Sequence, residues 1–181
     1  MTDTYISPFS EGRRSSWIKL RTLILLRWTA IFGQISAILI AIGYFNLQIE
    51  LFRCLIAIGV SIAANIGAMF VFPGNKRLSE TQNMLMILFD VLQLGFLLYL
   101  TGGLQNPFSI LLLAPVAVSA SVLTLRSTIV LGGSAIVIAT VLSLYHIPLT
   151  TIDGLLLGIP DIFIFGNWIA IVIALIFLSV Y

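Results

Sequence analysis

The chain has 181 residues, of which 60% are hydrophobic and 9% are charged, and its formal net charge is +2. Soluble domains are about half apolar and about a quarter charged, so this composition excludes an ordinary soluble fold. The few basic residues form no patch suited to binding nucleic acid. Long, continuous apolar runs favour helices that span a membrane over the alternating segments of a membrane β-barrel.

Residues 1–27 are polar to amphipathic and contain five of the basic residues. We predict that this stretch is a cytoplasmic segment whose charges set the orientation of the chain in the membrane. Residues 17–21 also fit a second interpretation, in which a short basic helix lies on an anionic membrane surface. The five basic residues are Arg13, Arg14, Lys19, Arg21 and Arg27.

Six apolar runs follow, and each approaches the roughly 20 residues that cross a bilayer core as a helix. We therefore predict an all-α, polytopic membrane protein with six transmembrane helices and short loops, filling residues 28–181. The predicted spans are 28–45, 51–72, 84–101, 108–125, 127–145 and 163–181.

The basic residues also predict the orientation. With a cytoplasmic N-terminus, eight of the nine fall on the cytoplasmic side, including Lys76, Arg77 and Arg126, and only Arg53 falls outside. Because cytoplasmic loops carry the excess of Lys and Arg, both ends of the domain are predicted to face the cytoplasm. The last run is still apolar at Tyr181 and has no closing basic residue, so we expect a longer native protein that continues into the cytoplasm.

The connection between the third and fourth spans, residues 101–108, is the most informative stretch. Gly102 and Gly103 suit the left-handed end of a helix. Asn106 suits a helix cap, and Pro107 suits the first helical position. These structural roles explain most of the residue choices. The same loop also has the chemistry to hold a flat, carbonyl-bearing lipid, since glycines allow close approach, Asn106 offers an amide and Phe108 offers a ring face.

The heptapeptide 102–108, Gly-Gly-Leu-Gln-Asn-Pro-Phe, matches the G-G-x-x-N-P-F sequence of the RegB/PrrB/ActS family of redox-responsive sensor histidine kinases. Residues 20–34, 90–101 and 114–119 also resemble this family, so the likeness covers most of residues 17–128. It implies a bacterial inner-membrane sensor domain that reads the redox state of ubiquinone, with Gly102, Gly103, Asn106, Pro107 and Phe108 as the quinone site.

The resemblance further implies a homodimer that signals through the sixth helix to a cytoplasmic kinase core. That core would bind ATP and pass its phosphate to a response regulator, and it is not part of this chain. The family's redox-active linker cysteine has no counterpart, because Cys54, the only cysteine, falls within the second span.

Asp90 is the only acid within a predicted span, and Gln93 lies one helical turn further on. We expect Asp90 to make a packing contact between helices, with Gln34 or Asn65 as its candidate partner, although a role in a proton or signal relay fits the same residues. Two other functional classes remain open, namely a small-molecule or ion transporter and a passive anchor or dimerisation domain. The sequence contains no catalytic constellation and no set of metal ligands.

Overall fold

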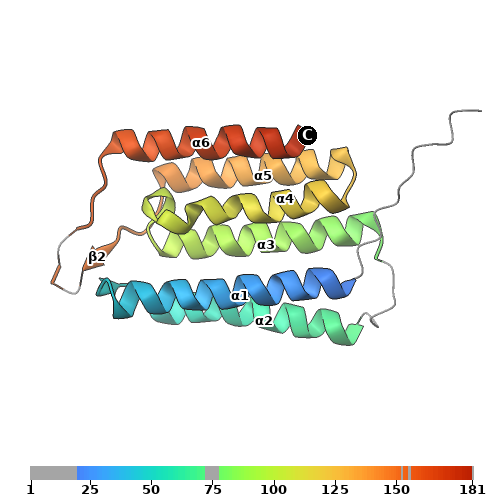
Figure 1. Cartoon of the computed structure of the whole chain (residues 1–181). Coiled ribbons are helices and arrows are strands. Elements are labelled where there is room, and N and C mark those ends of the chain that lie inside the picture. Colours follow the sequence, from blue (N-terminus) through green and yellow to red (C-terminus); the bar gives the residue numbers. More distant parts are fainter. Residues whose placement is uncertain (1–19, 72–77, 152, 155, 181) are drawn as a thin grey trace, which may run out of the picture.

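The computed structural model describes residues 20–71, 78–151, 153–154 and 156–180, and most of them are helical (Figure 1). This confirms the predicted all-α, six-helix architecture. The elements in chain order are α1 (Leu20–Gly43), β1 (Leu47–Gln48), α2 (Leu51–Val71), α3 (Glu80–Leu100), the 3₁₀ helices η1 (Gly103–Gln105) and η2 (Pro107–Leu112), α4 (Leu113–Val122), α5 (Leu125–Leu144), β2 (Thr150–Thr151) and α6 (Asp161–Val180).

The first helix begins at Leu20, eight residues before the predicted start of its span. The apolar run 23–26 precedes Arg27 and continues the helix upstream. Arg27 therefore lies within α1 and is not part of a flanking tail. The predicted cytoplasmic segment before Leu20 lies outside the described residues, and so do Lys76 and Arg77 in the second connection.

The fourth apolar segment differs most from the prediction, because its first six residues form the 3₁₀ helix η2 and only ten form α4. A 3₁₀ helix rises about 2.0 Å per residue and an α-helix about 1.5 Å, so the 16 residues Pro107–Val122 extend roughly 27 Å. That length nearly matches the hydrocarbon core of a bilayer, about 30 Å thick. The tighter winding thus lets a short segment span most of a membrane.

The helices form two groups that share α3. One core joins α3 to α4, α5 and α6 around buried residues such as Val91, Val116 and Leu175. The other joins α1 and α2 to α3 around Ile31, Cys54 and Leu97. In Figure 1 the α1–α2 pair lies along one side of the α3–α6 group.

The start of α1 and the end of α6 lie at the same end of the bundle (Figure 1). The turn between α3 and η2 lies at the opposite end, near β2. There β1 and β2 form an antiparallel pair in which Leu47 is opposite Thr151 and Gln48 is opposite Thr150. This small sheet ties the α1–α2 connection to the α5–α6 connection.

Gly132 on α5 packs directly against Ser179 on α6. A Cβ atom at this position would lie 1.8 Å from Oγ and 2.9 Å from Cβ of Ser179. Gly132→Ala is therefore expected to lower the free energy of unfolding by about 1–3 kcal/mol, since α6 must shift away. Gly133→Ala is the matched control, because nothing lies within 4 Å of its added Cβ. Thermal unfolding followed by circular dichroism checks this, and equal melting temperatures for the two variants would contradict it.

Candidate functional site

The turn after α3 has the left-handed geometry expected of its two glycines, with φ values of 99° at Gly102 and 58° at Gly103. A Cβ atom at Gly103 would lie 2.5 Å from the carbonyl oxygen of Leu142 and 2.7 Å from Cβ of His146. The absent side chain at Gly103 therefore lets the turn pack directly against the end of α5. These two glycines shape the turn.

Asn106 holds the turn together, and its predicted role as a cap is confirmed. Its Oδ1 accepts a hydrogen bond from the backbone N–H of Phe108 at 2.9 Å. Its Nδ2 donates to the carbonyl oxygen of Thr101 at 3.0 Å and to Oγ1 of Thr101 at 2.8 Å. Pro107 occupies the first position of η2. The amide that the sequence offers to a ligand is thus already bonded within the loop.

The same turn is bonded directly to α6. Nδ2 of Asn167 donates to the carbonyl oxygen of Leu104 and to Oγ of Ser109, each at 3.0 Å. The neighbouring Trp168 packs against the core that contains Leu104, and its Nε1 donates to Oγ1 of Thr140 at 3.1 Å. A movement of the turn would therefore act directly on α6.

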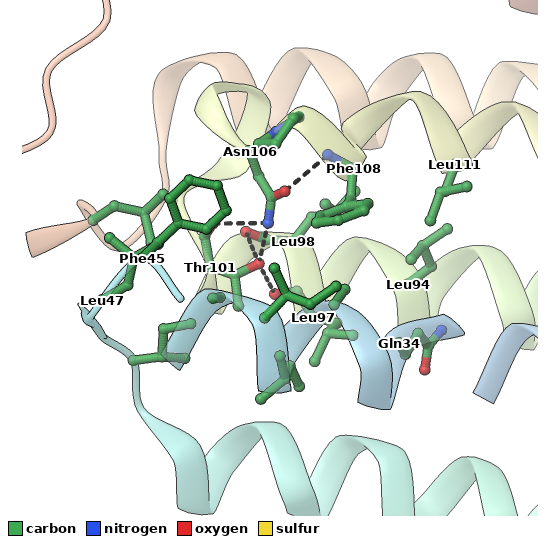
Figure 2. A pocket seen from close by; sticks show the side chains of 17 residues that line it. Gln34, Phe45, Leu47, Leu94, Leu97, Leu98, Thr101, Asn106, Phe108 and Leu111 are labelled. Carbon is green, nitrogen blue, oxygen red and sulfur yellow. Dashed lines mark hydrogen bonds between the residues drawn. The ribbon is translucent and has the colours of Figure 1, made fainter. Parts of the chain in front are cut away.

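A small cavity of about 90 Å³ lies beside the turn, between α1, α3 and η2 (Figure 2). Asn106, Pro107 and Phe108 line it, together with Phe45 and Thr101. Gly102 and Gly103 do not line it. The structure thus places three of the five predicted quinone-binding residues on one cavity wall and gives the two glycines a role in shaping the turn.

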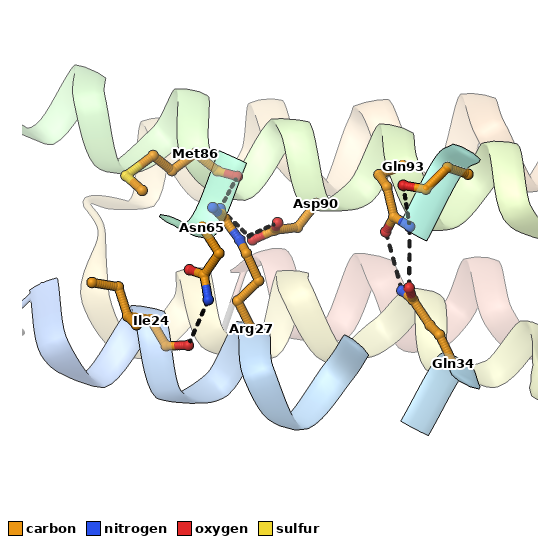
Figure 3. Close-up of polar contacts among 8 residues, drawn as sticks. Ile24, Arg27, Gln34, Asn65, Met86, Asp90 and Gln93 are labelled. Carbon is orange, nitrogen blue, oxygen red and sulfur yellow. Dashed lines mark hydrogen bonds and ion pairs between the residues drawn. The ribbon is translucent and has the colours of Figure 1, made fainter. Parts of the chain in front are cut away.

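Two polar bridges join α1 to α3 (Figure 3). In the first, Nε of Arg27 lies 2.7 Å from Oδ1 of Asp90, and Nη2 of Arg27 donates to Oδ2 of Asp90 at 3.0 Å. The same Nη2 also donates to the carbonyl oxygen of Met86 at 3.1 Å. The expected contact of Asp90 with a neighbouring helix is confirmed, but the predicted partner, Gln34 or Asn65, was wrong, because Arg27 on α1 pairs with it. Asn65 instead donates to the carbonyl oxygen of Ile24.

In the second bridge, the side-chain amides of Gln34 and Gln93 face each other. Each Nε2 donates to the other's Oε1 at 3.1 Å. Nε2 of Gln93 also lies 3.5 Å from the carbonyl oxygen of Ala57 on α2. Both amides are buried. The two residues that the sequence grouped with Asp90 are therefore close to each other, but they form a pair of their own.

A second cavity, of about 340 Å³, lies between α1, α3 and α4. Arg27, Asp90, Gln34 and Gln93 are all among its lining residues, and most of its remaining wall is apolar. Gln34, Leu94 and Leu111 line both this cavity and the smaller one. We call the two neighbouring cavities together the α1–α4 groove. It extends from the Arg27–Asp90 pair to the heptapeptide.

The sequence did not identify Arg27 or Ser61 as part of this site. Ser61 is on α2, is 2% exposed and lines the larger cavity. The sequence did contain a hint, because Arg27 follows an apolar run and Asp90 is the lone acid in the predicted third span, 84–101. Opposite charges within apolar runs suggest an ion pair inside the membrane. Nothing in the sequence distinguishes Ser61 from other serines in helices. Within the described ranges, no three His, Cys, Asp or Glu side chains gather as metal ligands.

Comparison with known proteins gives three findings. The family model described as "PilS-like transmembrane domain" matches residues 10–154. Two curated proteins of Cereibacter sphaeroides, each described as "Sensor histidine kinase RegB", are 48% and 49% identical to this chain over 172 residues. These matches cover 95% of this chain but only 37% of each relative. No solved structure matches the chain. The resemblance inferred from the heptapeptide is thereby confirmed.

Proposed function

Since the chain belongs to the family of PilS-like transmembrane domains, we propose that it is the membrane input domain of a redox-responsive sensor histidine kinase. Its similarity to the RegB kinases over 95% of its length supports this role. The whole protein would sit in a bacterial inner membrane, with both ends of the domain in the cytoplasm. It would work as a homodimer and pass phosphate from ATP to a response regulator.

The signal in this proposal is the redox state of the ubiquinone pool, read in the α1–α4 groove. The main support for this proposal is the position of the heptapeptide. Residues 106–108 form one wall of the groove, while Asn167 bonds the same turn to α6. A ligand in the groove would therefore act on the helix that leads out of the domain. It shifts the output only if it binds one packing of the helices better than another.

The transport alternative has less support. An acid on a transport path is usually part of a water-filled or proton-accepting route. Asp90 is instead engaged by Arg27 through both of its carboxylate oxygens. If the chain were a passive anchor, substitutions in the groove would change its stability but not the response of the kinase to quinone.

The test is autophosphorylation of the full-length protein in proteoliposomes that contain either ubiquinone or ubiquinol. Oxidised quinone should lower the rate. Phe108→Ala should raise the quinone concentration for half-inhibition about tenfold, because about 1.5 kcal/mol of apolar contact is lost. Phe163→Ala, which removes an exposed ring from α6, should leave that concentration unchanged. Equal rates with both forms of the quinone would refute the proposal.

A further inference from the structure

The small cavity beside the heptapeptide is too small to hold a substituted ring by itself. Its volume is about 90 Å³, whereas a cavity that holds benzene measures about 150 Å³. The larger cavity of about 340 Å³ lies within the usual size range of ligand pockets, about 300–1,000 Å³. A ring in the α1–α4 groove therefore fits the larger cavity, with the heptapeptide at one end of the groove.

The polar groups around the larger cavity suit an uncharged ligand. Among the described residues, the two charges that line it, Arg27 and Asp90, are paired with each other. Gln34 and Gln93 use one lone pair of each Oε1 in their mutual hydrogen bonds, and no described residue accepts the second N–H of Gln34. Ser61 is buried and adds a hydroxyl-bearing side chain to the wall of the same cavity. These groups can donate to a carbonyl and can also accept from a hydroxyl.

The cavity also opens sideways. Its rim contains the exposed residues Leu26, Ala30 and Gly33 on α1 and Leu111 and Ala114 across from them. In a membrane an opening along the sides of two spanning helices faces the lipid. A ligand would thus enter from the bilayer, and it must be lipid-soluble.

We propose that the ring of a lipid-soluble quinone binds in the larger cavity between α1, α3 and α4, with the Gln34–Gln93 amide pair as its hydrogen-bonding partner. This inference rests on the proposed function and assigns the ring to residues outside the heptapeptide. Because the amide pair also bridges α1 and α3, a ligand that takes over one of its hydrogen bonds changes the contact between the two helix groups.

The test is photolabelling of the chain in phosphatidylcholine nanodiscs with an azido-substituted ubiquinone analogue, followed by peptide mapping. Label should appear on α1 and α3 near Gln34 and Gln93, and excess short-chain ubiquinone should compete it away. Gln34→Leu/Gln93→Leu should raise the Kd of the competing quinone about tenfold. The double variant is used because a single change would leave the other buried amide unpaired.

A cavity-filling variant keeps the test independent of the amides. Gly33 lines the cavity and has open space at its Cβ position, so Gly33→Leu should fill the cavity and abolish most of the competable label. Gly59→Leu on α2 is the matched control, because its Cβ position is equally open and it does not line the cavity. The Gly59→Leu chain should show as much competable label as the unmodified chain.

The outcomes separate this inference from the proposed function. Competable label confined to residues 102–108, with Gly33→Leu and the double variant binding normally, would overturn this inference and leave a quinone sensor standing. Label that no excess of quinone competes away would indicate partition into lipid, and both proposals would fall.

Discussion

Asp90→Ala is expected to lower the free energy of unfolding of the chain by about 3–5 kcal/mol, because it leaves the Arg27 guanidinium buried without its partner. The Arg27 side chain is only 7% exposed, and its Nε and Nη2 both face the Asp90 carboxylate. Lipid solvates an unpaired cation poorly, so the helix pair cannot easily relieve this cost. Unfolding of the chain in detergent micelles, followed by circular dichroism, measures the loss.

A double variant and an exposed ion pair serve as controls. Arg27→Leu/Asp90→Leu should recover most of the stability, since it removes both charges and keeps apolar volume. Arg53→Ala disrupts the pair with Glu50, whose side chains are 57% and 48% exposed and 3.5 Å apart. It should cost about 1 kcal/mol or less. If Asp90→Ala were no more damaging than Arg53→Ala, the bridge between α1 and α3 would not stabilise the fold.

Gly103→Ala is expected to lower the free energy of unfolding by about 2–5 kcal/mol, since two costs add at this position. The residue has φ of 58°, and the new Cβ would lie 2.5 Å from the Leu142 carbonyl oxygen, a backbone atom that cannot rotate away. The turn must therefore move away from α5. The same unfolding measurement in detergent micelles checks the size of the loss.

Gly154→Ala is the matched control, because it has the cost of a left-handed backbone without the steric clash. Its φ is 79°, and nothing lies within 4 Å of an added Cβ. Gly154→Ala should therefore cost only about 1–2 kcal/mol, the penalty for left-handed geometry. A similar loss in both variants would mean that the close packing of the turn against α5 adds nothing, and that the turn is free to move independently of α5.

The parts of the fold that depend on local sequence were predictable. Continuous apolar runs located six helices, and Gly102, Gly103, Asn106 and Pro107 gave the geometry of the turn, because backbone conformation and capping depend on adjacent residues. The start of α1 was missed because Arg27 was interpreted as a flanking charge. A charge marks the end of a span only if no partner within the membrane neutralises it, and that partner, Asp90, is 63 residues away.

The candidate site was predictable only in part for the same reason. Gln34 and Gln93 stood out as polar residues within apolar runs, but their pairing depends on how α1 and α3 face each other. The 3₁₀ winding of η2 also follows no clear sequence signal, although it positions Phe108 and Leu111 on the groove. Ser61 joins the cavity from α2, which no spacing along the chain indicates.

A titration of the 181-residue chain in nanodiscs with short-chain ubiquinone, monitored by tryptophan fluorescence, shows whether a quinone site reaches the heptapeptide. If the quinone site extends to the heptapeptide, we expect quinone to quench the tryptophan fluorescence in a saturable way. Half-saturation should then shift to higher quinone concentration in Asn106→Ala and Phe108→Ala. Linear quenching that never saturates and is identical in both variants would contradict it. The quinone would then be dissolved only in the lipid, and the heptapeptide would be a capped turn between two helices.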